Sequence, residues 1–154
     1  MTPDAIAQIK RSHAAIAATP RQLSARFYEE LFTRAPELRR LFPEDLTVLQ
    51  GHFEAALALI IRNLDEVDAL AESLRDLGAQ HVHWGARPGD YAIARDALVA
   101  AIRALSAGWS PSLEGDWRAA ITAIVVPMLQ GAAVHTALVA EQIAADGSGE
   151  PQAN

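Results

Sequence analysis

The fold of this chain is decided by the stretch Leu77-Gly78-Ala79-Gln80-His81-Val82-His83-Trp84-Gly85-Ala86-Arg87-Pro88-Gly89-Asp90-Tyr91. Leu70, Leu74, Leu77 and His81 recur at spacings of four, three and four residues, which places the His81 imidazole on the apolar face of a helix. A histidine in that position can be a buried metal ligand. The alternative is a core histidine bonded to a backbone carbonyl, and this stretch alone favours the alternative because lone histidines on apolar faces are common.

His83 competes with His81 for the role of ligand. It lies two positions away and about 200° around the helix axis, so only one of the two rings can face the interior. The leucine series selects His81. Leu77 and Gln80 lie within about one turn of His81 and are expected beside the same site.

Length and composition limit the classes of protein that the chain can belong to. Its 154 residues suit one domain with its own core. The longest apolar run, Ala55 to Ile61, is far shorter than the ~20 residues of a membrane helix, so no membrane association is expected. The first residues show no signal peptide, which predicts a cytoplasmic location. The formal net charge of −6 opposes binding to phosphate backbones, so nucleic acid is not an expected partner.

The chain is predicted to be all-α. No alternating β-branched run bounded by turn residues occurs, and Ala, Leu, Arg and Glu dominate between prolines and glycines. Ser110 and Pro111 supply a start signal for the last helix. Helices are expected at about residues 4–18, 20–34, 36–41, 45–63, 66–83, 89–107 and 112–144.

A second segment is Phe27-Tyr28-Glu29-Glu30-Leu31-Phe32-Thr33-Arg34-Ala35-Pro36-Glu37-Leu38-Arg39-Arg40-Leu41-Phe42-Pro43. Together the two segments resemble the globins, most closely single-domain bacterial haemoglobins and the haem module of flavohaemoglobins, over about Ile6 to Ala140. The resemblance implies a globin fold, a 3-over-3 helical sandwich around a haem, in a domain spanning residues 1–145. The tail at 146–154 has little apolar content and is expected to be disordered. Because the chain has no cysteine, attachment through a Cys-x-x-Cys-His motif is excluded, and the haem is expected to be a non-covalent haem b.

The resemblance implies that His81 ligates the haem iron. Globins have at this point a helix ending in histidine, followed here by Gly85, Pro88 and Tyr91. One ring nitrogen of His81 would bind the iron while the other donates to a carbonyl or a side chain. Flavohaemoglobins orient this imidazole with a tyrosine, which Tyr91 matches, and with a glutamate, whose expected position here is Ala132. Electron donation from the imidazole to the iron is therefore expected to be weaker than in flavohaemoglobins, and peroxidase-like O–O cleavage less favoured.

The distal side of the haem is expected to be formed by the second segment. Tyr28, directly after Phe27, matches the tyrosine that in the bacterial relatives donates to iron-bound oxygen. Such a hydrogen bond would stabilise bound O₂ by about 0.5 to 3 kcal/mol. Phe42 matches the phenylalanine that globins stack on the haem plane. The alternatives are an ordinary core tyrosine and an ordinary core phenylalanine.

The fourth expected helix departs from the pattern of the relatives. Leu49 falls where they usually carry glutamine and where animal globins carry histidine, so the usual polar distal residue is missing. Gln50 could take that place if the helix were rotated or the preceding loop shifted by one residue. Phe53, one turn beyond Leu49, would crowd the sixth position on the iron.

His52 is open to three interpretations. The first in rank is a solvated residue or one that contacts a haem propionate. The second is a sixth ligand to the iron in the absence of O₂, which would need rotation of the start of the helix. The third is a surface side chain without a role.

These residues predict a haem globin that reversibly binds O₂, and also CO and NO, for oxygen delivery or NO detoxification. No flavin or nicotinamide module fits in the chain, so turnover as an NO dioxygenase or a pseudo-peroxidase would require a separate reductase. The alternative is a globin-fold sensor or interaction module, with or without haem. A monomer and a homodimer are both compatible with the apolar stripes of the long helices.

Overall fold

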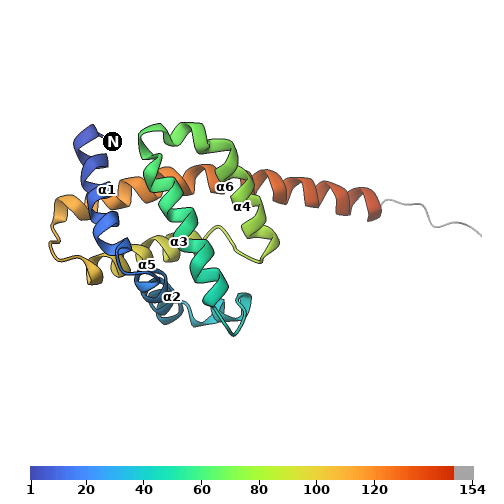
Figure 1. Cartoon of the computed structure of the whole chain (residues 1–154). Helices are drawn as coiled ribbons and strands as arrows, with labels where there is room; N and C mark the ends of the chain where they lie inside the picture. The colour runs from blue at the N-terminus through green and yellow to red at the C-terminus, as the bar shows by residue number, and fades with distance from the viewer. Residues whose placement is uncertain (148–154) are drawn as a thin grey trace, which may run out of the picture.

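The protein is built from helices over the part of the chain that the structure, a computed structural model, describes, which is residues 1–147 (Figure 1). No strand occurs within these residues, so the prediction of an all-α chain is confirmed. The elements are, in chain order, α1 (Pro3–Ala17), α2 (Gln22–Arg34), the 3₁₀ helix η1 (Pro36–Leu41), α3 (Thr47–Arg62), the 3₁₀ helix η2 (Leu64–Leu70), α4 (Ala71–His83), α5 (Asp90–Leu105) and α6 (Pro111–Gly147).

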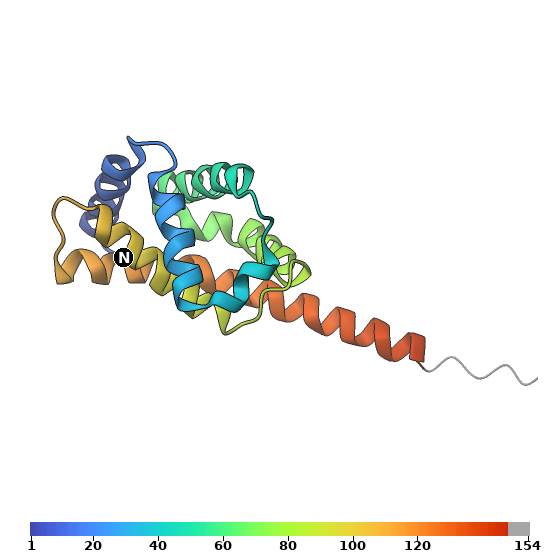
Figure 2. The ribbon, with the colours of Figure 1, turned by 90° about the horizontal axis from the view of Figure 1, so that it is seen from below.

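The α-helices form two layers. In one layer α2 packs on α5 and α5 on α6; from the other layer, α4 and α1 pack on α6, and α3 packs on α2 and α1. Figure 1 shows α3 crossing this framework, and Figure 2 shows the same arrangement from below. This is the 3-over-3 sandwich expected of a globin fold.

The start of α2 is fixed by a side chain from α3. Glu54 accepts hydrogen bonds from the backbone N–H of Arg21 at 3.0 Å and of Ser24 at 3.1 Å, and from the Ser24 hydroxyl at 2.9 Å. Arg21 has a left-handed backbone with φ of 65°. The helix therefore begins at Gln22, two residues later than the sequence predicts, because a carboxylate thirty residues away satisfies its first backbone donors.

The helix predicted at 66–83 is two elements. Residues 64–70 form the 3₁₀ helix η2, and the α-helical hydrogen bonding of α4 begins only at Ala71. Glu66 interrupts the regular backbone with φ of −124° and ψ of 38°. The apolar periodicity carries through both elements, so the sequence pattern does not reveal the break.

The crossing of α4 and α6 is closer than ordinary side chains permit. A Cβ atom on Gly78 would lie 1.9 Å from the carbonyl oxygen of Met128, and a Cβ atom on Gly131 would lie 1.9 Å from the carbonyl oxygen of Arg75. The two glycines thus let the two backbones touch at reciprocal points. This contact fixes the position of α4, the helix that carries His81.

The buried core is divided into two clusters. The large cluster is centred on helices α1, α2, α5 and α6 and includes Trp117, whose indole N–H donates to the Ser12 hydroxyl at 3.1 Å. The small cluster joins α4, α5 and α6 through Leu74, Tyr91, Ile124 and Met128. The buried residues of α3, Leu57 and Ile61, belong to the large cluster, and the buried Leu74 of α4 belongs to the small one.

The helix α6 continues well beyond the core. Its last buried residue is Ala132, and from there it projects away from the other helices (Figures 1 and 2). It is long and apolar enough to span a membrane by length and composition, although its first half belongs to the core. Asp146 and Gly147, expected in an unstructured tail, are the last turn of α6, and the rest of that expected tail, residues 148–154, lies outside the described residues.

Candidate functional site

The candidate site lies between the large and the small cluster of the core. Within the described residues, α3 and α4 are not among the helix pairs that pack closely, although both belong to the same layer. Apolar side chains on both sides keep part of their surface uncovered. Those packed on the large cluster include Leu41, Phe42, Leu46, Leu49 and Phe53, and those packed on the small cluster include Ile60, Leu70 and Leu77.

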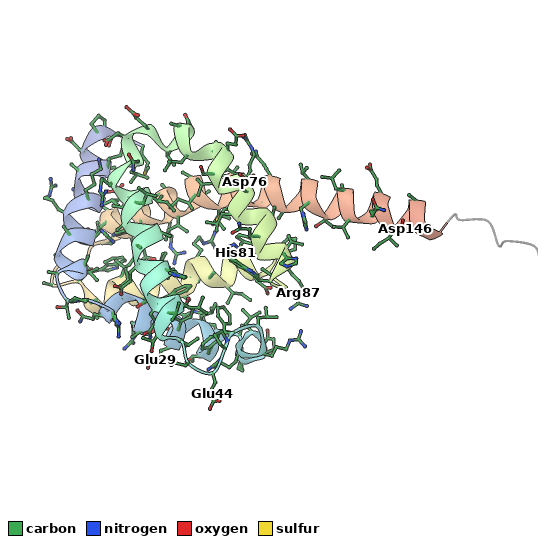
Figure 3. The ribbon with its side chains drawn as sticks, turned by 45° about the vertical axis from the view of Figure 1, so that its right-hand side comes forward. Glu29, Glu44, Asp76, His81, Arg87 and Asp146 are labelled. Carbon is green, nitrogen blue, oxygen red and sulfur yellow. The ribbon has the colours of Figure 1, made fainter. Side chains whose placement is uncertain are left out.

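His81 is the polar side chain of α4 at this division. Its Nδ1 lies 2.7 Å from the carbonyl oxygen of Leu77. Because a carbonyl only accepts, Nδ1 carries the proton and donates it, which leaves the lone pair of Nε2 on the neutral ring free to bind a metal. His81 is partly buried and directed toward the centre of the molecule, whereas Glu44 points outward (Figure 3). His83, the competing residue, is exposed.

Two aromatic rings surround the imidazole of His81. The ring centroid of Trp84 lies 5.2 Å away and that of Tyr91 lies 6.2 Å away. Together with the bond to Leu77, these contacts hold the imidazole in one orientation. Trp84 was not among the predicted site residues, although its place one turn after His81 would have indicated the contact.

The end of α4 is fixed directly after His83. Gly85 has a φ of 100°, its N–H donates to Val82 at 3.0 Å, and the N–H of Ala86 donates to the carbonyl of His81 at 2.9 Å. These two bonds form a Schellman motif, in which glycine is favoured at the left-handed position. A Cβ atom on Gly85 would also lie 2.9 Å from the Leu41 side chain, so the turn rests on η1.

Tyr91 carries an unsatisfied polar group beside the imidazole. Its hydroxyl is buried and has no hydrogen-bond partner among the described residues. Burial raises the pKa of this phenol above its ordinary value, so it stays protonated. Ala132, the position at which the resemblance to flavohaemoglobins implies a glutamate, is buried and offers no acceptor.

The opposite side of the site is an aromatic cluster. Phe27 and Phe53 stack with ring centroids 4.6 Å apart, and Tyr28 meets Phe42 edge to face at 5.5 Å. Tyr28 also lies 6.0 Å from Phe53, and Phe32 lies 5.2 Å from Phe42. The Tyr28 side chain is buried, and this burial raises the pKa of its hydroxyl. Residues of α2, η1 and α3 that are distant in the sequence therefore form one surface.

The remaining predicted site residues lie at different depths. Leu49 packs against the large cluster, and Gln50 is also partly buried. His52 and Gln80 are exposed. The structure thus brings Phe42, Leu49 and Phe53 together with Tyr28, and keeps His52 and Gln80 at the surface.

These residues fit a haem. The free Nε2 of His81 supplies an axial ligand, and the uncovered apolar side chains on both sides of the division supply faces for a flat apolar group. The buried, unpartnered hydroxyl of Tyr91 lies next to that ligand. A helical sandwich with an axial histidine and an apolar site of this kind is typical of all-α haem proteins.

The chain belongs to the globin family, whose family model, described as Globin, matches residues 25–128. It is 27% identical over 119 residues to an anaerobic nitrite reductase of Oryza sativa subsp. indica, covering 73% of this chain and 82% of that protein. Family membership implies a haem cofactor.

Solved structures with the same fold include two bacterial proteins. A bacterial globin from Campylobacter jejuni superposes with a TM-score of 0.73 at 18% identity, over 90% of this chain and 99% of that one. The engineered carbene transferase RmaNOD, a candidate nitric oxide dioxygenase from Rhodothermus marinus, superposes with a TM-score of 0.75 at 24% identity, also over 90% of this chain and 99% of that one. At these identities the likeness establishes the fold.

Proposed function

We propose that the chain binds haem b non-covalently through Nε2 of His81 and uses it to bind O₂ reversibly, with CO and NO as further ligands. The observation that carries this proposal is the bond from Nδ1 of His81 to the Leu77 carbonyl, because it fixes the proton on one nitrogen and leaves the other free. A bound haem supplies an iron that takes diatomic gases and exchanges electrons.

The chain's own residues define the environment of that iron. Tyr28 is protonated at neutral pH, as an ordinary phenol is, and burial raises the pKa of its hydroxyl further, so it is available as a hydrogen-bond donor on the side opposite His81. Leu49, Phe42 and Phe53 supply apolar surface that excludes water from the same side. A distal side with one donor and apolar walls favours a neutral diatomic ligand over water.

The proximal side of the haem, the side of the proposed ligand His81, favours ligand binding over cleavage of an O–O bond. Among the described residues no carboxylate bonds the Tyr91 hydroxyl, Ala132 stands where the resemblance to flavohaemoglobins implies a glutamate, and the carbonyl of Leu77 is a neutral acceptor. A neutral acceptor increases the imidazolate character of His81 less than a carboxylate does. We therefore place reversible ligand binding first.

Removal of NO is a second proposed function. The names of two similar proteins, an anaerobic nitrite reductase and a candidate nitric oxide dioxygenase, support chemistry with nitrogen oxides. That chemistry changes the oxidation state of the iron, so continued turnover would need a separate reductase. A haem-independent interaction module is the third possibility, and the experiment below separates it from the other two.

The test is the absorption spectrum of the purified protein in its ferric, dithionite-reduced and CO-bound forms. The proposal predicts a Soret band that shifts with CO in the wild type and that is lost or strongly changed in His81→Ala. The matched control is His83→Ala, an exposed histidine on the same helix, which is expected to keep the wild-type spectrum. Absence of haem from the wild type after reconstitution, or an unchanged spectrum in His81→Ala, would overturn the proposal.

A further inference from the structure

The part of α6 beyond the core exposes several large apolar side chains. Val134 is 61% exposed, Leu138 is 58% exposed and Ile143 is 66% exposed. Residues 133–145 carry one charged side chain, that of Glu141. A helical stretch that projects from the other helices for about 12 residues is marginal in water, and its exposed apolar surface is costly. The extension therefore requires a second surface to cover it.

A largely apolar groove beside the first half of α6 could receive an apolar helix such as the extension. It has a volume of about 710 Å³ and lies between α6 on one side and η2 with the start of α4 on the other. The α6 wall presents Ala119, Ala123, Val126 and Gln130 at spacings of four, three and four residues. Val134 and Leu138 continue this series into the extension, so the groove and the apolar extension share one face of one helix.

We propose that the extension of each chain occupies the groove of a second copy, in an antiparallel, two-fold symmetric dimer. Antiparallel pairing of two α6 helices places the extension of one copy over the groove of the other, and does so twice. The lengths agree, because at ~1.5 Å per residue the α6 wall from Arg118 to Gln130 spans about 18 Å and the extension from Val134 to Ala145 spans about 17 Å. The Val134 and Leu138 face of the extension and the groove then cover each other.

Charge supports the same occupant, because the groove is lined by two cations, Arg75 and Arg118, and one carboxylate, Asp68, and the extension carries one acidic side chain. Arg75 lines the groove and bonds only the neutral Gln130 side chain among the described residues, at 3.4 Å. Arg118, the other cation of the groove, already pairs with Asp96 and Glu114. Glu141 is on the extension, within the Val134 and Leu138 face, and has no ion pair in the described chain. The carboxylate of one copy and the guanidinium of Arg75 in the other are therefore available to pair across the interface.

A lipid surface fits the extension less well. Residues 133–145 contain no Lys or Arg that would attract anionic headgroups and no Trp or Tyr that would anchor at the membrane interface. The groove would also stay uncovered if α6 were bound to lipid. The dimer covers the groove and the Val134 and Leu138 face of the extension with residues of this chain alone. It depends on the fold and not on the proposed ligand chemistry.

The first test measures the mass of the full chain by light scattering and sedimentation equilibrium. The proposal predicts twice the 16.5 kDa of one chain, falling toward one chain on dilution. Leu138→Glu is expected to weaken dimerisation at least tenfold. Leu59→Glu is the matched control, because Leu59 is 51% exposed on α3, and it should behave as the wild type. Circular dichroism checks that each variant is folded.

The second test examines the pairing directly. Arg75→Glu and Glu141→Arg should each weaken the dimer several-fold, and the double variant should restore it. The chain has no cysteine, so Val126→Cys chains mixed with Leu138→Cys chains carry thiols at the groove and the extension only. Oxidation of the mixture should cross-link them faster than either variant alone.

Three outcomes would overturn the inference. They are a wild-type chain of single mass at every concentration, a dimer that Leu138→Glu leaves intact, and capture of the chain by phosphatidylcholine and phosphatidylserine vesicles that Leu138→Glu abolishes. None of these readouts depends on haem. A protein that dimerises as predicted but lacks a Soret band would refute the proposed function and leave the dimer standing.

Discussion

A Cβ atom on Gly78 would lie 1.9 Å from the carbonyl oxygen of Met128, closer than any non-bonded contact allows. The backbone of α4 therefore rests directly on the backbone of α6. His81 follows Gly78 by three residues on the same helix, so the position of the proposed iron ligand is set by this helix crossing.

Gly78→Ala is expected to destabilise the protein. The added methyl group must push α4 away from α6, and overpacking of this kind costs typically 1 to 3 kcal/mol, with the upper end expected because the obstacle is backbone. The measurement is the free energy of unfolding by urea. Haem affinity should fall with it, because α4 moves.

The matched control is Gly115→Ala, since Gly115 lies in α6 with nothing within 4 Å of its Cβ position. That substitution should leave stability unchanged or raise it by up to about 1 kcal/mol, as alanine is the better helix former. Equal effects of the two substitutions would show that the close crossing does not contribute to stability.

The sequence predicted the helices better than their contacts. Leu70, Leu74, Leu77 and His81 share one face, and this periodicity was sufficient to place His81 on the inner side of α4 and His83 outside. Helical periodicity is local, so it can be seen in a single sequence. The break between η2 and α4 was missed because both elements keep the same apolar face.

Contacts between distant residues could not be predicted. Glu54 caps a helix thirty residues before it, and nothing in the α3 sequence distinguishes it from a solvent-facing glutamate. Gly78 and Gly131 act as a pair, whereas each alone is only an unfavourable residue in a helix. The roles of Leu49 and Gln50 stay predictions, since both are partly buried.

Tyr28→Phe is expected to speed the dissociation of O₂ by a few-fold to ~100-fold, the range that corresponds to the loss of one hydrogen bond of 0.5 to 3 kcal/mol. The Tyr28 hydroxyl is protonated at neutral pH, as an ordinary phenol is, and burial raises its pKa further, so the wild type has the donor that the variant lacks. Stopped-flow displacement of O₂ measures the rate. Dissociation of CO, a less polar ligand, should change less.

Gln50→Leu serves as the comparison for Tyr28→Phe, because it removes the other polar side chain near the distal side. It should leave O₂ dissociation unchanged if Leu49 occupies the distal position. A large effect of Gln50→Leu with none from Tyr28→Phe would assign the donor to Gln50.

His52→Ala should leave the spectrum of the ferrous, ligand-free protein unchanged and five-coordinate. The His52 side chain is exposed, and the start of α3 would have to rotate to bring it inside, where Leu49 and Phe53 already pack. Absorption in the visible region reports the coordination number. A low-spin wild-type spectrum that became five-coordinate in His52→Ala would instead identify it as the sixth ligand.

The stability of the protein should fall as the pH drops below about 6.5, and His13 should contribute to this loss. Burial lowers the pKa of His13 below its ordinary value, and the nearby Glu54 carboxylate offsets part of that effect. Because the folded-state pKa is the lower one, the unfolded chain takes up the proton first as the pH falls. The stabilisation is therefore complete above the unfolded pKa and is lost progressively down to the folded pKa. In His13→Gln this component is absent, so unfolding free energies measured by urea from pH 8 to pH 5 should decline less steeply than in the wild type. Parallel curves for the two proteins would show that His13 does not take part.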